Sequence, residues 1–248
     1  MNVEQRRIQC WDIDAGYAAA HEKYRISDLA VVGYQEIEIS GMPYATCVGQ
    51  RLDDATYIPS STLILTGNLR TLFSAAFEHT GPLLHQYFQS EFAPCFCSML
   101  KQGPMGKDVD DSYRWHRDSG PSSHLKLVVY LNDDHDGATA VMSREDSRKF
   151  IDAGYLEQER LFHLDDFASE HGISYKPYRV QPKAGSGLIF EPTNVLHKGI
   201  YPTAGERRVF QIGIIPWGKP WESFYEEHWA KGYTNSNGFP RYEAGQIA

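Results

Sequence analysis

Two histidines and one aspartate form the clearest chemical pattern in the sequence. His116 and Asp118 are separated by one residue in YRWHRDSG, and His197 follows much later in NVLHKG. Two imidazoles and one carboxylate can hold iron(II) on one face of its octahedron and leave the opposite face open. If residues 112–118 form a strand, alternation points His116 and Asp118 to the same side. The pattern predicts a metal site built from these three side chains.

Other histidines in the chain fit structural roles better. A second His-x-Asp step, His163 and Asp165, lies in a polar, helix-prone stretch, where positions i and i+2 face apart. We therefore expect an exposed or helix-capping His163. The run NDDHDG around His135 and Asp136 is typical of a turn, and we expect its polar side chains to be solvated. We expect surface or packing roles for three more histidines, which are His21, His79 and His171.

The elements that must position the metal site change in type along the chain. Helices are predicted over residues 12–30 and 68–91, the second interrupted near Gly81-Pro82, with strands at 34–41 and 45–52 between them. After residue 93, short apolar runs between turn residues predict further strands, which are 96–103, 112–118, 124–132, 138–142, 185–192 and 207–216. A helix-prone insertion covers residues 143–173.

This order of elements predicts a mainly β fold with buttressing helices (α+β). Helices followed by many short strands favour an antiparallel sandwich or barrel, and an open barrel end suits a ligand. We expect a single domain over residues 1–248. Residues 1–92 would support the barrel, 93–216 would form its core around the insertion, and 217–248 would be a tail.

The composition argues against several classes of partner. The 24 Lys and Arg residues are outnumbered by 32 Asp and Glu residues, whereas nucleic-acid binding needs a basic surplus. The N-terminus lacks the apolar core of a secretion signal, and no stretch approaches a membrane span, so we expect a cytoplasmic protein without a membrane partner. The aromatic tail segment WGKPWESFYEEHW would cover the barrel or form a homodimer interface.

Two longer segments resemble one known superfamily, the iron(II)/2-oxoglutarate-dependent dioxygenases. LKLVVYLNDDHDGATAV resembles a segment of the prolyl-4-hydroxylase-like branch, where YLN precedes a Gly-containing turn and a Thr. VQPKAGSGLIFEPTNVLHKGIYPTAGERRVFQIGI is similar to its C-terminal block. There a Pro-Lys-x-Gly turn leads to an L-x-F strand, the distal histidine and a Gly-x-Arg step, here Gly205-Glu206-Arg207. The second choice is the phytanoyl-CoA hydroxylase-like branch, which places the arginine one residue later.

The resemblance covers roughly residues 93–216 and implies a double-stranded β-helix, the jelly-roll or cupin-like barrel. It implies that His116, Asp118 and His197 bind Fe(2+), with 2-oxoglutarate and O2 as cosubstrates. Arg207 would bind the distal carboxylate of 2-oxoglutarate through its planar fork. Arg208 is the alternative, because adjacent strand residues face opposite sides.

Several further residues are candidates for contacts in this pocket. With Arg207 inward, alternation turns Gln211 into the barrel, where it is a candidate for substrate binding. Lys126 and Tyr130 share a strand face and are candidates for contacts with 2-oxoglutarate, although Tyr130 also fits the core. Arg114 shares a face with His116 and would be a substrate-facing cation or a surface residue. Related halogenases lose the acid at the position of Asp118, so its presence implies hydroxylation or another halide-free oxidation such as desaturation.

Three functional classes remain open from the sequence. An oxygenase would hydroxylate a small metabolite or amino-acid derivative with release of succinate and CO2; a protein side chain is the alternative substrate. A cupin-like metalloenzyme would bind metal without 2-oxoglutarate, which leaves Arg207 unexplained. A non-catalytic binding barrel would bind neither the metal nor 2-oxoglutarate.

Overall fold

The computed structural model describes residues 32–38, 61–63, 69–104, 111–120, 123–155, 160–161 and 163–229. Four predictions lie outside these residues, namely the helix at 12–30, the strand at 45–52, His21 and the tail beyond residue 229. No helix in the described part of the chain is long and apolar enough to cross a membrane.

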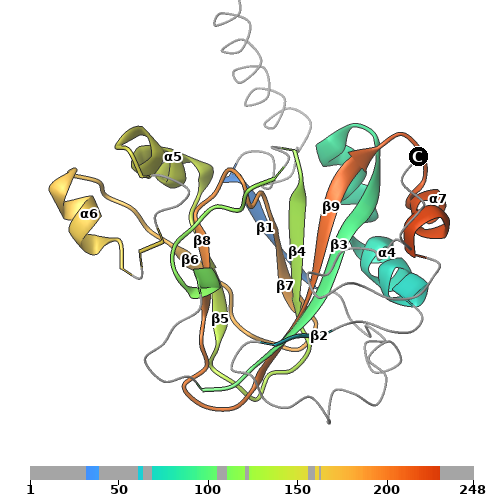
Figure 1. The fold of residues 1–248 in the computed structure, drawn as a ribbon, viewed down its shortest axis with the longest axis horizontal. Coiled ribbons are helices and arrows are strands. Elements are labelled where there is room, and N and C mark those ends of the chain that lie inside the picture. The colour runs from blue at the N-terminus through green and yellow to red at the C-terminus, as the bar shows by residue number, and fades with distance from the viewer. Residues whose placement is uncertain are drawn as a thin grey trace, which may run out of the picture.

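Two antiparallel sheets form the framework (Figure 1). The larger has the order β1-β7-β4-β9-β3-β2 and the smaller the order β6-β5-β8. The larger sheet consists of β1 (Tyr34–Glu38), β7 (Ser186–Phe190), β4 (Leu125–Tyr130), β9 (Arg207–Trp217), β3 (Glu91–Gln102) and β2 (Ser61–Leu63). The smaller consists of β6 (Tyr178–Arg179), β5 (Ala138–Val141) and β8 (His197–Ile200).

Helices lie on both sides of this framework (Figure 1). On the side of β3 and β9 lie α4 (Leu69–Phe88), α7 (Trp221–Phe224) and the π-helix η3 (Tyr225–Trp229). On the side of the smaller sheet lie α5 (Arg144–Asp152) and α6 (Asp165–Glu170), which occupy the predicted insertion. A short 3-10 helix, η2 (Asp111–Tyr113), precedes His116. The prediction of antiparallel strands with supporting helices is confirmed.

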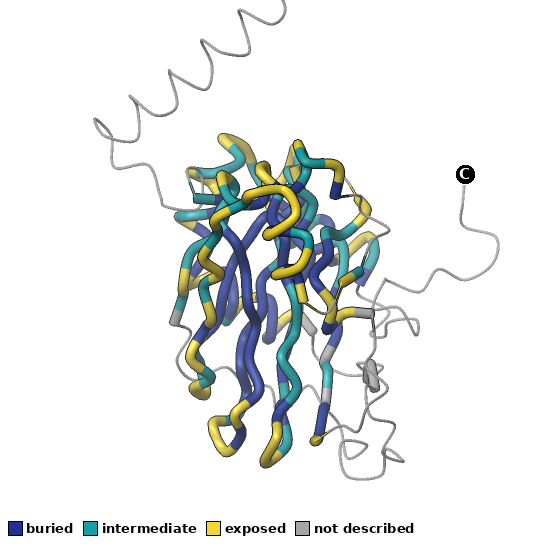
Figure 2. Tube along the Cα trace, turned by 90° about the vertical axis from the view of Figure 1, so that its left-hand side faces the viewer, coloured by how far each residue is buried: buried dark blue, intermediate teal, exposed yellow. Residues whose placement is uncertain are grey.

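Alternation along the central strands divides their side chains between two environments. In β9, Phe210, Ile212 and Ile214 pack with α4 and η3 in one apolar cluster. Val209, on the opposite face, joins a second cluster that lies between the two sheets. Figure 2 shows the central strands as mostly buried and the loops at their ends as exposed. A cavity is lined by residues of the smaller sheet and by three polar residues of the larger sheet, which are Ser98, Lys126 and Gln211.

Helix α4 runs without a break through Pro82, so the predicted interruption at Gly81-Pro82 was wrong. Proline inside a helix costs about 3 kcal/mol, because it removes a hydrogen-bond donor and crowds the preceding turn. Buried apolar residues on both sides of Pro82 offset this cost. Phe73, Phe77 and Leu84 all belong to the cluster between α4 and the larger sheet.

Candidate metal centre

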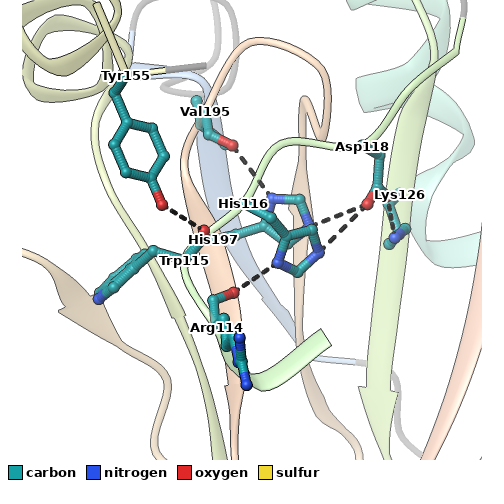
Figure 3. Close-up of polar contacts among 8 residues, drawn as sticks. All are labelled: Arg114, Trp115, His116, Asp118, Lys126, Tyr155, Val195 and His197. Carbon is teal, nitrogen blue, oxygen red and sulfur yellow. Dashed lines mark hydrogen bonds and ion pairs between the residues drawn. The ribbon is translucent and has the colours of Figure 1, made fainter. Parts of the chain in front are cut away.

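The side chains of His116, Asp118 and His197 point toward one another (Figure 3). All three line a cavity whose wall includes residues of both sheets. One ligand atom from each lies within 4.8 Å of the others. The Oδ1 atom of Asp118 is 3.4 Å from His116 Nε2 and 3.6 Å from His197 Nε2. The structure thus brings together the three residues that the sequence pattern selected.

His116 and Asp118 do not lie in a regular strand, so the predicted strand at 112–118 was wrong. After η2, Trp115 and His116 each form only an isolated bridge, with Leu161 and His197 respectively. The backbones of His116 and His197 exchange two hydrogen bonds of 3.1 and 2.9 Å, and Asp118 N donates to Pro192 O at 2.8 Å. Two distant segments therefore fix this loop, and they bring the side chains together without strand alternation.

Backbone carbonyls set the tautomer of both histidines. His116 Nδ1 lies 2.7 Å from Arg114 O, and His197 Nδ1 lies 3.1 Å from Val195 O. A carbonyl oxygen only accepts hydrogen bonds, so each Nδ1 carries the proton and donates it. Each ring then directs its Nε2 toward Asp118 (Figure 3).

The donor set fits a divalent metal ion. His197 Nε2 is buried and has no hydrogen-bond partner among the described residues. Burial lowers the pKa of His197 to about 4, so the ring is neutral at pH 7. Burial opposes ionisation of Asp118, yet the nearby Lys126 ammonium holds its pKa well below the usual range. Two nitrogen lone pairs and one carboxylate oxygen thus face each other, as binding of iron(II) requires.

The cavity beside these residues has a volume of about 250 Å³ and extends to Arg207. Both sheets contribute to its wall, and so does η2. The apolar lining residues are Phe96, Leu100, Val128 and Phe190, and the polar ones include Ser98, Lys126, Thr139 and Gln211. A pocket of this size suits a small ligand held by a few polar groups.

Arg207 is the arginine that enters the cavity. Its side chain is buried and donates hydrogen bonds from Nη1 to Gln102 Oε1 at 2.7 Å and from Nη2 to Thr139 Oγ1 at 2.9 Å. Its Cζ lies 5.5 Å from the centre of the Tyr130 ring. Arg208 is partly exposed and donates instead to Glu206 Oε1 at 2.7 Å. Adjacent positions on β9 thus face opposite sides, as the sequence analysis predicted for Arg207.

The other candidates occupy different positions. Lys126 and Gln211 line the cavity, and Lys126 forms an ion pair with Asp118. Tyr130 is buried behind Arg207 and donates to Thr139 Oγ1 at 3.1 Å. Arg114 is exposed and does not line the cavity that the described residues form.

Among the described histidines outside the triad for which we made a prediction, all but His135 follow it. His79, His163 and His171 are exposed. His135 was expected to be solvated, but only 8% of it is exposed, and its ring centre lies 6.0 Å from that of Tyr130. Burial and the Arg207 charge lower its pKa. The backbone of the turn at 133–137 packs against Gly205, which is far away in the sequence.

Sequence reasoning did not assign a site role to Gln102, Thr139 or Ser98. Gln102 ends β3 opposite Arg207, and Thr139 lies on the smaller sheet. A polar residue at the end of an apolar strand was the available signal for Gln102. Its partner could not be known, because the pairing of β3 with β9 joins segments far apart in the chain.

No protein-family model matches this sequence, and no curated protein matches it. Solved structures are similar in fold. The non-haem alpha-ketoglutarate-dependent epimerase SnoN from nogalamycin biosynthesis aligns with a TM-score of 0.50 and 13% identity over 93% of this chain and 96% of SnoN. The carbocyclase SnoK from the same biosynthesis gives a TM-score of 0.49, 12% identity and coverages of 88% and 94%. A Pseudomonas putida prolyl-4-hydroxylase gives a TM-score of 0.48, 16% identity and coverages of 77% and 97%. The SnoN alignment confirms the predicted likeness at the level of the fold.

Proposed function

We propose that this protein is a non-haem iron(II)/2-oxoglutarate-dependent oxygenase with a double-stranded β-helix core. One observation carries the proposal: the three converging metal-ligand atoms and the buried Arg207 line the same cavity. The metal residues suit iron(II), and the arginine suits the distal carboxylate of a short dicarboxylate. A cupin-like metalloenzyme without a ketoacid would have no use for a buried guanidinium at this position.

Each residue has a defined task in this proposal. His116 Nε2, His197 Nε2 and Asp118 Oδ1 hold iron, because their lone pairs already point to a common centre. Arg207 binds the distal carboxylate of 2-oxoglutarate, while Gln102 and Thr139 orient its guanidinium. When both are bound, iron and 2-oxoglutarate supply the oxidising chemistry, in which O2 converts a substrate C–H to C–OH as 2-oxoglutarate becomes succinate and CO2.

The apolar residues of the cavity keep bulk water away from this chemistry. Phe96, Val128 and Phe190 lie along its wall, and Val128 and Phe190 are buried. Gln211 offers an amide to substrate or cosubstrate between the metal residues and Arg207. The fold alone does not select a substrate, because one scaffold hosts many. We propose a small metabolite or amino-acid derivative as substrate, since the cavity volume is about 250 Å³; a protein side chain is the alternative.

Succinate formation tests the proposed function without knowledge of the substrate. The purified protein would be incubated with iron(II), ascorbate, 2-oxoglutarate and O2, and slow turnover uncoupled from substrate would be followed as succinate. Succinate production should require both iron and O2, and it should be lost in the variants His197→Ala and Arg207→Met. Arg208→Met is the matched control, because Arg208 faces away from the cavity. Succinate formation that survives in His197→Ala, or that is absent from the wild type, would contradict the proposal.

A further inference from the structure

Lys126 and Asp118 form an ion pair that gives the two oxygens of the metal-site carboxylate different partners. The Nζ atom of Lys126 contacts Oδ2 of Asp118, and Oδ1 of the same carboxylate faces both histidines (Figure 3). The Lys126 side chain is 18% exposed and that of Asp118 is 22% exposed, so the pair is largely shielded from water. A charge-assisted hydrogen bond in such surroundings is strong.

Lys126 is held in place because it lies on a central strand of the larger sheet, which is hydrogen-bonded on both sides. Lys126 lies on β4, and its backbone pairs with Phe190 on β7 and with Gly213 on β9. Asp118, by contrast, lies in an irregular loop that is fixed by a backbone hydrogen bond to Pro192. The rigid strand therefore supplies the contact that orients the carboxylate of the loop. A carboxylate without this partner is free to rotate or to bind a metal through both oxygens.

The charges in the cavity give Lys126 and Arg207 different tasks. In the described part of the chain, Arg207 donates its hydrogen bonds to the neutral oxygens of Gln102 and Thr139 and forms no ion pair, so its positive charge is available to an anion. The charge of Lys126 is already balanced by Asp118. Binding of 2-oxoglutarate by Lys126, for which strand alternation made it a candidate, would compete with this ion pair and leave a metal ligand without its partner.

We propose that Lys126 is a positioning residue, which holds Asp118 so that only Oδ1 binds the metal, and that it is not a ligand of 2-oxoglutarate. This proposal rests on the proposed function only in its second part, since the first concerns the metal alone. Partners of metal ligands typically affect metal affinity by about 10- to 100-fold.

The test measures metal and cosubstrate binding separately in three variants, with cobalt(II) as the probe. Cobalt affinity is measured by competition with a chelator, and the visible spectrum reports the coordination of the metal. The affinity for 2-oxoglutarate is then measured by calorimetry on cobalt-saturated protein. Lys126→Met should weaken cobalt binding by about 10- to 100-fold and change its spectrum, with little effect on 2-oxoglutarate affinity. Lys126→Arg, which keeps a cation near Oδ2, should restore most of the affinity and the spectrum.

Arg207→Met is the matched control and should show the opposite pattern, with normal cobalt binding and weak 2-oxoglutarate binding. Circular dichroism establishes that each variant is folded; if Lys126→Met does not fold, the same readouts are taken on Lys126→Gln. Cobalt affinity and a spectrum equal to wild type in the folded Lys126 variant would overturn the proposal. Loss of 2-oxoglutarate affinity in that variant would overturn it too and assign Lys126 to the cosubstrate. Wild-type protein that binds cobalt but not 2-oxoglutarate would contradict the proposed function and still test the role of Lys126 in metal binding.

Discussion

Gln102 and Arg207 are cross-strand partners on β3 and β9, and Gln102 Oε1 accepts a hydrogen bond of 2.7 Å from Arg207 Nη1. Thr139 Oγ1 accepts a second one from Nη2 at 2.9 Å. These bonds come from two different sheets and fix the plane of the guanidinium. They leave its charge unopposed by any carboxylate in the described residues, so the geometry prepares Arg207 for an anionic ligand.

Replacement of Gln102 should therefore weaken cosubstrate binding while leaving the metal site intact. A hydrogen bond to a charged group contributes about 1.5 to 3 kcal/mol, so Gln102→Leu should raise the Kd for 2-oxoglutarate by about 10- to 100-fold. Calorimetry on metal-saturated protein measures this change. Gln181→Leu, at an exposed position, is the control and should bind like wild type. An unchanged Kd in Gln102→Leu would show that the orientation of Arg207 does not depend on this bond.

The buried carboxylate of Glu191 should be a major source of stability near the metal centre. It accepts hydrogen bonds from Tyr87 on α4, from Arg144 on α5 and from Asn194 at 3.4 Å. The next residue, Pro192, accepts the hydrogen bond from Asp118 N. Removal of one partner of a buried ion pair lowers the free energy of unfolding by about 3 to 5 kcal/mol. Because Arg144 is partly exposed, we expect the loss in Glu191→Gln to lie near the lower end of this range.

Urea denaturation would measure this loss in the free energy of unfolding. Glu145→Gln is the matched control, because the Glu145 side chain is 85% exposed and its ion pair with Lys149 is on the surface. Exposed pairs of this kind contribute about 0.3 to 0.5 kcal/mol. Equal effects of the two substitutions would contradict the stabilising role of Glu191.

Asp136 should make stability depend on pH in the acidic range. The Thr203 hydroxyl and the backbone N–H groups of Thr203 and Ala204 donate to its carboxylate and lower its pKa from 3.8 to about 2. Because the pKa in the folded state lies below that of the unfolded chain, this stabilisation is present above about pH 4. It should be lost as the pH falls from about 4 to about 2.

Asp136→Asn removes the titrating group and allows this pH dependence to be measured. The free energy of unfolding of the variant should be lower than that of the wild type at pH 7. The difference between the two proteins should shrink as the pH decreases toward 2. A difference that stays constant with pH would show that the carboxylate charge of Asp136 does not contribute.

Local patterns in the sequence predicted those parts of the site that depend on residue type and on strand alternation. The types and spacing of His116, Asp118 and His197, together with the resemblance of the segments around them, selected these residues. Alternation along β9 placed Arg207 inward and Arg208 outward, because apolar residues at Phe210 and Ile212 marked the opposite face. The antiparallel sheets and the helices of the insertion followed from the same kind of local pattern.

Features that depend on contacts between distant segments could not be predicted. The helix through Pro82 is stabilised by packing against the sheet. The turn that carries His135 packs against Gly205, and the loop at His116 depends on the backbone of His197. The contact of Lys126 with Asp118 likewise joins β4 to the loop after η2, and local sequence does not predict how these two segments lie relative to each other. In each case tertiary contacts outweigh the preference of the local sequence.

One cavity should hold iron through His116, Asp118 and His197 and hold 2-oxoglutarate through Arg207. The most direct test is to add iron(II) and then 2-oxoglutarate to the metal-free protein without oxygen, and to record the weak visible charge-transfer band of the chelate. We expect the band in wild type and in Arg208→Met, no band in His197→Ala, and a much weaker affinity for 2-oxoglutarate in Arg207→Met. Bound iron without any band on addition of 2-oxoglutarate would contradict the account.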